Sequence, residues 1–398
     1  MRVSGLDVHK DTIFCAVHNG KKPEAVKEFL TLTSSIREMG TYLKGVGVET
    51  VAMESTGIYW IPVWNILETM GFKLMLINPY LIKQMPGRKS DVKDAQWIAM
   101  LLQKQLLRGS LVPGARIREL RTYSRKYVKL QQRMTTALQA IERTLELCNI
   151  RITSFVTKIE SKSVLSVVKR IIQGETSPDH LVECIFGSII NKHGPKIKQS
   201  LEGFICEHQR FALELNYAEY EFLLGQSQRC EEMMYKLCTE HYSRELELLQ
   251  TIPGIKLLAA MLIIAETGAD MKAFENSGKF SGWTGLRPRN DESAGKYKST
   301  AITKGNRYLC ALLVQVAWGA VRTKGSSFQE KFARLAIRKS RKKALIAMAR
   351  KLGVVVWNIL YHDQPYNPQL VATYEPEKVL AKVNYHQREI ARLQRRLV

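Results

Sequence analysis

A run of ten positions between Ile117 and Cys148 constrains the fold of this chain more than any other segment. Its members alternate steps of three and four residues without a break, and eight of them are apolar or aromatic: Ile117, Leu120, Ser124, Tyr127, Gln131, Met134, Leu138, Ile141, Leu145 and Cys148. This spacing predicts a long helix with a coiled-coil seam. The seam can pair with a second subunit, giving a dimer or tetramer, or with the later helical stretch from about 207 to 250. Gln131 sets the register of that pairing or is simply tolerated in it.

The first 110 residues carry two other periodicities. Short β-prone runs occupy 2–7, 12–18, 48–54 and 73–78, and segments with helical spacing occupy 34–43, 60–71 and 91–105. The strands come first as a meander and then alternate with helices. This order predicts an α/β sheet sandwiched by helices.

Four carboxylates lie at the ends of these elements. Asp7 ends the first strand-like run, and Glu54 ends the run VAME. Side chains at the carboxyl ends of neighbouring strands converge on one edge of a sheet. Asp91 and Asp94 open the third helix, where a spacing of three residues puts both on one helical face. Taken singly, an Asp after a strand is usually a turn residue, and DxxD at a helix start is usually a cap.

Four carboxylates at one place would repel each other unless cations lay between them. Two Mg²⁺ or Mn²⁺ ions with oxygen ligands remove that repulsion. Such a pair, ~4 Å apart, holds the attacking and leaving oxygens of a phosphodiester displacement. The sequence therefore predicts a Mg²⁺ (or Mn²⁺) site formed by Asp7, Glu54, Asp91 and Asp94.

The charge of the chain points to a polyanionic partner. The formal net charge is +23 over 398 residues, and the segment 296–351 holds 15 Lys and Arg against one acid, Glu330. Nucleic acid is the leading candidate for such an excess. The expected phosphate contacts are Lys296, Lys298, Lys304, Arg307, Arg322, Lys324, Arg334, Arg338, Lys339, Arg341, Lys342, Lys343, Arg350 and Lys351.

Other compositional signals exclude some classes of protein. No apolar run reaches the ~20 residues of a membrane-spanning helix, so no membrane partner is expected. The seven cysteines form no CxxC pair, and we therefore expect neither a disulfide framework nor a zinc knuckle. No recognition helix or zinc finger that would read a DNA sequence is evident. We expect a cytoplasmic, nucleoid-associated protein.

The C-terminal half is predicted to be mainly helical. Pro253-Gly254 separates two helical runs and resembles a helix-hairpin-helix, whose turn amides can hold a DNA phosphate. An ordinary tight turn between helices has the same sequence pattern. Basic helices are predicted over roughly 304–323 and 327–360, and a basic amphipathic helix from about Glu377.

Four motifs, in this order, resemble the signatures of DEDD-type insertion-sequence transposases. They are GLDVHKDT (5–12), AMESTGIYW (52–60), INPYLIKQMPGRKSDVKDA (77–95) and GLRPRNDESAGKYKSTAITKGNRYLCALLVQVAW (285–318). Members of this family are recombinases guided by a bridge RNA. The resemblance implies a RuvC-like, RNase-H-type N-terminal domain with Asp7, Glu54, Asp91 and Asp94 as the DEDD set. Asp11, also in the first motif, is expected to be a turn or helix residue.

The resemblance also implies a catalytic serine, Ser293, that becomes joined to a DNA phosphate. A serine hydroxyl can attack phosphorus and keep the bond energy for later rejoining, if a metal ion or nearby cations activate it. Family members commonly have Ser followed directly by Gly, whereas Ala294 intervenes here. Ser281 and Ser299 are the reserve candidates. The guide RNA follows from the resemblance alone.

These expectations combine into one domain plan and one function. The plan is a DEDD domain at 1–112, a coiled-coil and helical linker at 113–247, a transposase domain at 248–365 and a basic helical extension at 366–398. The expected function is cleavage and rejoining of the DNA of a mobile element and its target, with the carboxylates and Ser293 meeting by folding or between subunits. The alternatives are a RuvC-like nuclease or junction resolvase without a serine intermediate, and a non-catalytic nucleic-acid scaffold.

Overall fold

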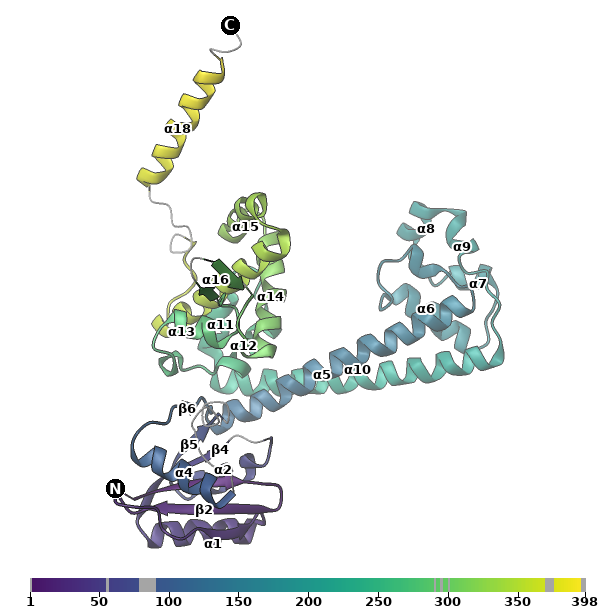
Figure 1. The fold of residues 1–398 in the computed structure, drawn as a ribbon. Helices are drawn as coiled ribbons and strands as arrows, with labels where there is room; N and C mark the ends of the chain where they lie inside the picture. Colours follow the sequence, from purple (N-terminus) through teal and green to yellow (C-terminus); the bar gives the residue numbers. More distant parts are fainter. Residues whose placement is uncertain are drawn as a thin grey trace. The chain divides into compact units, whose positions relative to one another are not determined.

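The computed structural model describes residues 2–54, 57–78, 91–289, 291–293, 296–299, 301–368 and 376–394 (Figure 1). The chain forms two compact units, Met1–Pro113 and Gly114–Val398. Separate clusters of buried apolar side chains form the interior of each unit.

The first unit is built on a six-stranded mixed sheet of order β3-β2-β1-β4-β5-β6. The strands are β1 (Arg2–Val8), β2 (Thr12–His18), β3 (Lys27–Leu30), β4 (Val48–Glu54), β5 (Lys73–Ile77) and β6 (Gly109–Ser110). β1, β2 and β3 form an antiparallel meander, and β4 and β5 extend the sheet in parallel on the other side of β1. The α/β class predicted from the sequence is confirmed; β3 and β6 were not predicted.

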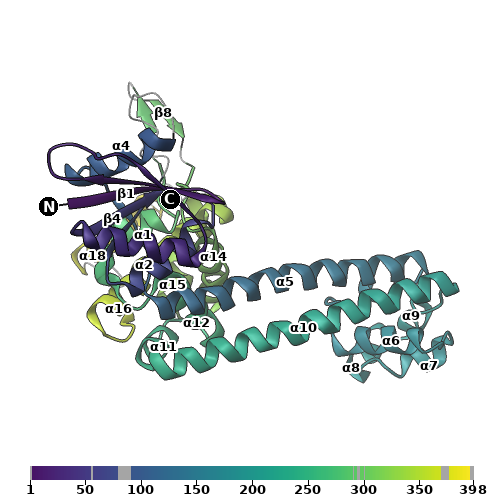
Figure 2. The ribbon, with the colours of Figure 1, turned by 90° about the horizontal axis from the view of Figure 1, so that it is seen from below.

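Helices cover both faces of this sheet, as Figure 2 shows. On one face lie α1 (Thr33–Gly45) and α2 (Trp60–Thr69), whose Met39 and Leu67 are fully buried against the strands. On the other face lies α4 (Asp91–Gln103), where Ile98 packs on Ala52. A Cβ atom on Gly5 of β1 would overlap the backbone of α4. Only glycine at this position lets the helix approach the strand so closely.

The second unit begins with two long helices that pack antiparallel, α5 (Ala115–Leu147) and α10 (Glu207–His241) (Figures 1 and 2). Gln131 Nε2 donates a hydrogen bond to Ser227 Oγ at 2.8 Å, near the middle of both helices. Gln209 Nε2 donates to the carbonyl oxygen of Leu147 at 3.3 Å, where α5 ends and α10 begins; this is called the far end of the pair. The seam predicted on α5 therefore faces the later helical stretch of the same chain, one of the two partners that the sequence left open.

Short helices cap the far end of the α5–α10 pair. They are η1 (Ile152–Ser154), α6 (Lys162–Ile172), α7 (Pro178–Val182), α8 (Gly187–His193) and α9 (Pro195–Gln199). Val164 and Ile171 of α6 share one buried cluster with Ile141 of α5 and Leu213 of α10. The sequence predicted only short helices and loops here.

The near end of the pair joins a helical core. Its helices are α11 (Ser243–Gln250), α12 (Leu257–Thr267), η2 (Met271–Ala273), α13 (Ser277–Trp283), α14 (Arg307–Arg322), α15 (Ser327–Arg338) and α16 (Arg341–His362). A hairpin of β7 (Asp291–Ser293) and β8 (Lys296–Ser299) lies between α13 and α14, and α18 (Pro376–Gln394) follows the core. Among the described helices, only α16 is long and apolar enough to cross a membrane; 56% of its apolar window is buried in the core.

Two predictions for this region are corrected or sharpened. The helix expected over 327–360 is two helices, because Ser340 adopts an extended conformation and its side chain caps α16 by accepting from Lys343 N at 3.4 Å. Between α11 and α12, Gly254 lies against the backbone of Ala320 on α14, where a Cβ atom would come within 2.5 Å of Ala320 N. This contact explains Gly254 as a packing residue of a tight helix–helix turn.

Candidate functional site

Asp7 and Glu54 lie on neighbouring parallel strands at the same level of the sheet. β1 and β4 pair in parallel up to Leu6 and Met53, and the two carboxylates are the next residue on each strand. Neighbouring strands lie about 4.8 Å apart. Asp7 is buried, with 6% of its surface exposed, and Glu54 is half-buried. The strand ends therefore bring these two carboxylates side by side.

Both carboxylates are on the face of the sheet that α4 covers. Successive side chains on a strand alternate between faces, so Asp7 shares the face of Gly5 and Glu54 shares that of Ala52. Gly5 lies under α4 and Ala52 packs on it. Asp94, in the first turn of α4, is half-buried and lies four residues before Ile98, which faces the sheet. Asp91 is the first residue of α4, and its side chain is outside the described residues.

Two further residues at this edge come from the turn between β1 and β2. His9 Nε2 lies 3.2 Å from Asp7 Oδ2. Asp11 is in the turn, where its carbonyl oxygen accepts from Thr31 N at 3.1 Å. His9 was not singled out in the sequence, although it is in the motif GLDVHKDT. Its ring nitrogen is within hydrogen-bond distance of the Asp7 carboxylate, whereas Asp11 lies in a turn, as expected.

The donor types at this edge fit a hard divalent cation. Carboxylate oxygens are the ligands that Mg²⁺ and Mn²⁺ take in proteins. Asp7, Glu54 and Asp94 provide them from two strand ends and one helix start. Among side chains that the structure describes, no three of His, Cys, Asp or Glu lie close enough together to form a metal site. The predicted fourth ligand, Asp91, is not among them.

Ser293 is the last residue of β7, in the hairpin with β8. Its side chain is outside the described residues. Figure 2 shows β8 extending away from the helical core. Of the reserve candidates, Ser281 is on α13 with 1% of its surface exposed. Ser299 ends β8, and its Oγ accepts from Ala301 N at 3.2 Å. Burial removes Ser281 as a candidate for attack on DNA.

The predicted phosphate contacts are mostly on the surface of the second unit. Eleven basic side chains are exposed and form no ion pair among the described residues: Lys304, Arg307, Arg322, Lys324, Arg334, Arg338, Lys339, Arg341, Lys342, Lys343 and Arg350. Six of them flank the turn between α15 and α16. Lys351 is half-buried, and burial together with the charge of Lys331 lowers its pKa. The side chains of Lys296 and Lys298, on β8, are outside the described residues.

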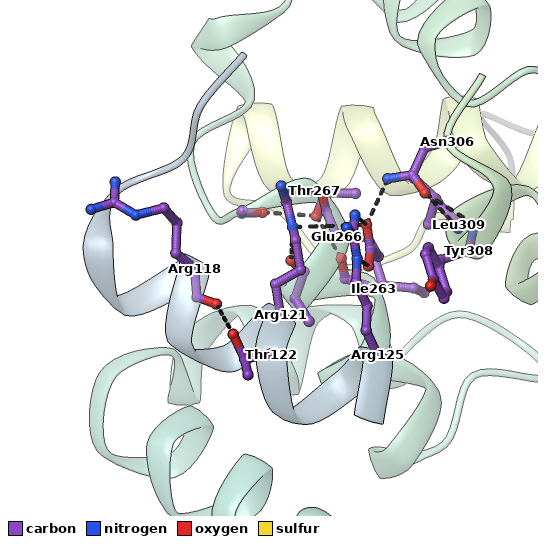
Figure 3. Close-up of polar contacts among 12 residues, drawn as sticks. Arg118, Arg121, Thr122, Arg125, Ile263, Glu266, Thr267, Asn306, Tyr308 and Leu309 are labelled. Atoms are coloured by element: carbon purple, nitrogen blue, oxygen red, sulfur yellow. Dashed lines mark hydrogen bonds and ion pairs between the residues drawn. The ribbon is translucent and has the colours of Figure 1, made fainter. Parts of the chain in front are cut away.

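Sequence reasoning missed a buried ionic cluster in the second unit (Figure 3). Glu266 of α12 is 1% exposed. Its carboxylate accepts from Arg125 Nε at 2.9 Å, Arg125 Nη2 at 3.0 Å and Asn306 Nδ2 at 2.6 Å. Arg121 Nη2 donates to the backbone carbonyl oxygen of Glu266 at 2.7 Å. The cluster ties α5 to α12 and to the start of α14.

The pKa of Glu266 reflects two opposing effects. Burial raises it, but the hydrogen bonds from Arg125 and Asn306 and the charges of Arg125 and Arg121 outweigh burial and hold the pKa below the usual value of a glutamate. Glu266 is therefore a buried anion at neutral pH. The one signal in the sequence was an acid in the otherwise apolar helix 257–267, since an acid is almost never fully buried unless it is paired.

Two family models match the chain, and together they cover more than half of it. One, described as "Transposase", matches residues 4–150 and is a model of the DEDD type. The other, described as "Transposase IS116/IS110/IS902 family", matches residues 246–333. The first match contains all four carboxylates, and the second contains Ser293 and Glu266.

Similar proteins include two transposases. The putative transposase y4pF/y4sB of Sinorhizobium fredii is 25% identical over 349 residues, which cover 83% of this chain and 78% of that protein. The transposase for insertion sequence element IS1111A of Coxiella burnetii is 21% identical over 377 residues, which cover 92% of this chain and 91% of that protein. A solved structure, T. thermophilus RuvC in complex with a Holliday junction substrate, matches 28% of this chain and 99% of that chain, with 14% identity and a TM-score of 0.22.

Proposed function

This chain belongs to the DEDD-type insertion-sequence transposases and is a DNA transposase, and from that premise we propose how it cleaves and rejoins DNA. In our proposal Asp7, Glu54, Asp91 and Asp94 hold divalent metal, Mg²⁺ or Mn²⁺, and Ser293 is the nucleophile. The observation that carries the proposal is the position of Asp7 and Glu54, side by side at the ends of β1 and β4 on the face covered by α4. The RuvC-like, RNase-H-type character of the first unit is part of the same proposal.

The metal half of the mechanism belongs to the first unit. Bound metal would stabilise the charge that develops on the phosphodiester oxygens. The chain's own contribution is to hold the ligands in place. Asp7 is fixed by its place in the sheet, and His9 lies against one of its oxygens at 3.2 Å. Gly5 lets α4 approach the sheet, so that Asp94, in the first turn of α4, would lie close to the strand ends.

The serine half of the mechanism belongs to the second unit. Ser293 loses its hydroxyl proton, and its oxygen attacks the phosphorus of a DNA phosphodiester. A serine–phosphate bond forms, the bond from phosphorus to one sugar oxygen breaks, and that sugar leaves as a hydroxyl. A sugar hydroxyl of the strand to be joined then attacks the same phosphorus and releases the serine. The number of phosphoester bonds is unchanged, so rejoining needs no ATP.

Sequence choice and assembly complete the proposal. The exposed cations of the second unit would bind nucleic-acid phosphates, so we expect binding to fall steeply with salt. A guide (bridge) RNA would select the element ends and the target by base pairing.

Because α10 fills the seam of α5, a dimer or tetramer would need surfaces other than that seam. If subunits share a site, mixing Asp7→Ala protein with Ser293→Ala protein restores activity that neither has alone.

The test of the proposal uses two readouts on DNA that carries the element ends and a target. Strand cleavage should require Mg²⁺ and fall roughly 1000-fold in Asp7→Asn, since a metal contributes several kcal/mol to such a transition state. Asp11→Asn is the matched control, because Asp11 lies in the adjacent turn. A denaturation-resistant protein–DNA adduct should form and be absent in Ser293→Ala, with Ser299→Ala as its control.

Each outcome separates this proposal from its alternatives. Mg²⁺-dependent cleavage without any adduct would indicate a nuclease or junction resolvase that uses water. Activity that is indifferent to Mg²⁺ and to Asp7→Asn would overturn the metal half.

A further inference from the structure

A basic pocket lies where α5, α13 and α14 meet in the second unit. Its volume is about 510 Å³, and its walls include Arg121, Arg125, Lys304, Arg307, Trp283 and Tyr308. Four of these six side chains are cationic and two are aromatic, and no carboxylate lines the pocket among the described residues. The combination of cations and aromatic faces is the one that proteins use to bind a nucleic-acid strand.

One wall of the pocket is held in place by hydrogen bonds. Glu266 lies behind it, buried, and binds both Nε and Nη2 of Arg125. Arg121 is held by the carbonyl oxygens of Ala265 and Glu266 at 3.1 and 2.7 Å, and its side chain is only 18% exposed. Arginines held in place in this way, Arg125 by a carboxylate and Arg121 by backbone carbonyl oxygens, lose less entropy on binding a ligand. Since it is one anion against four cations, the pocket keeps a net positive charge.

The pocket also has an open wall. Lys304 and Arg307 are exposed and pair with no carboxylate among the described residues. The ring of Tyr308 lies between two guanidinium groups, 4.6 Å from that of Arg125 and 5.0 Å from that of Arg307. Two cations thus remain for a ligand phosphate, and the aromatic ring is held in place by cation–π contacts.

The pocket lies at the base of the hairpin that carries Ser293. Asn306 N donates to the carbonyl oxygen of Trp283 at 3.0 Å, which closes the base. A Cβ atom on Gly305 would overlap the backbone of Gly285, so the two backbone segments that lead into and out of the hairpin touch there. Above the base, Pro288 pairs with Ile302, and β7 and β8 follow. The eight Cα–Cα steps from Gly285 to Ser293 span at most about 29 Å.

We propose that this pocket binds a backbone phosphate of the DNA strand that Ser293 attacks. The inference rests on the proposed function, because it takes Ser293 as the nucleophile. A DNA strand whose phosphate reaches Ser293 in the hairpin has another phosphate, a few nucleotides away, at the level of the pocket. Lys304 and Arg307 contact the phosphate, and Arg121 and Arg125 supply the fixed positive field behind it. The Glu266 carboxylate holds Arg125 in place.

The test measures binding without chemistry, in EDTA. The probes are a labelled single-stranded DNA of about 20 nucleotides and an RNA of the same sequence, each titrated by fluorescence anisotropy at several salt concentrations. For a single strand, each phosphate contact contributes about 0.7 to the slope of log K against log salt. Lys304→Ala and Arg307→Ala should each lower the slope for DNA by about 0.7. Lys192→Ala and Arg229→Ala, exposed residues on α8 and α10, are the matched controls.

Two results would overturn the proposal: slopes for Lys304→Ala and Arg307→Ala equal to those of their controls, or a reduction seen with RNA alone. The proposed function fails separately, by the absence of the serine–DNA adduct in Mg²⁺ with the wild-type chain. If the adduct forms but the slopes match the controls, only the pocket is wrong. If the pocket binds DNA, Lys304→Ala should also raise the DNA concentration for half-maximal adduct formation.

Discussion

Replacing Glu266 by glutamine removes the buried charge that joins α5, α12 and α14 and keeps nearly the same shape. Glutamate offers two acceptors, and both are used: Oε1 by Arg125 Nε, and Oε2 by Arg125 Nη2 and Asn306 Nδ2. Glutamine offers one oxygen and one amino group. With its oxygen at the Oε2 position it keeps two bonds, but its amino group then faces Arg125 Nε, donor against donor.

The expected loss of stability follows from this geometry. One charge-assisted hydrogen bond disappears, at a cost of about 1.5–3 kcal/mol, and the other two become weaker. Removing one partner of a buried ion pair costs about 3–5 kcal/mol in general. The Arg125 side chain is 40% exposed, so water can solvate the guanidinium that loses its partner. We therefore expect the lower end of that range, about 3 kcal/mol.

Urea unfolding followed by far-UV circular dichroism measures this loss. The two units can unfold separately, so the transition of the helical second unit is fitted on its own. With a slope of about 3 kcal/mol per molar urea, its midpoint should fall by roughly 1 M. Glu214→Gln is the matched control, since Glu214 is exposed on α10, and it should change stability by no more than about 0.5 kcal/mol. A shift no larger than that of Glu214→Gln would refute the argument.

The pH dependence gives a second check with a fixed sign. The pKa of Glu266 is lowered on folding, so its contribution is fully present above the pKa of an unfolded glutamate, about 4.3. It is lost as the pH falls through the lower folded value. The stability difference between wild type and Glu266→Gln should therefore shrink as the pH drops below about 4.3. A difference that grows in acid would contradict the assignment of Glu266 as a buried anion.

Three further outcomes are expected. Gly5→Ala places a Cβ atom on the backbone of α4 and should destabilise the first unit by about 1–3 kcal/mol, measured by thermal unfolding. Gln131→Leu leaves the buried hydroxyl of Ser227 without its partner and should cost about 1–2 kcal/mol in urea, whereas adding Ser227→Ala should recover most of the loss. Burial raises the pKa of Cys15 to about 11 and of Cys238 to about 12. Mass spectrometry should find both thiols unalkylated in the native chain at about pH 8 and alkylated after unfolding.

The elements that sequence periodicity could predict are those with a long or alternating apolar pattern. The four strands and three helices of the first unit were predicted close to their observed bounds, since each buries one face or both. β3 and β6 were missed because they are edge strands of four and two residues and are mostly exposed. β7 and β8 are short and polar, so neither has an apolar alternation that would predict a strand.

The interruption between α15 and α16 shows a different limit. No Pro or Gly marks it, and the six residues from 338 to 343 (RKSRKK) are all polar. The helix ends because Lys339 and Ser340 adopt extended conformations and Ser340 caps the next helix. A serine before a run of cations is a weak signal, since serine is equally common on exposed helix faces.

The parts of the candidate site also differ in how far the sequence could predict them. Asp7 and Glu54 could be placed from the sequence because a strand end has a fixed position relative to its parallel neighbour. The cluster around Glu266 could not, because Arg125 lies 141 residues away and on the flank of a helix whose seam carried all the periodic signal. Contacts of this kind depend on how helices pack, which local pattern does not encode.

The antiparallel pair of α5 and α10 has a consequence for how relatives of this chain can differ in size. Because its seam repeats every seven residues, a deletion of seven residues from α5 and of the seven that face them on α10 restores the same packing. Each such paired deletion would shorten the arm, that is, the α5–α10 pair, by about 10.5 Å and leave both of its ends unchanged. The family models match 4–150 and 246–333, so they omit α10 and the short helices from η1 to α9 that cap the pair. We expect arm length to vary among transposases of this family in steps of whole heptads, on both helices at once.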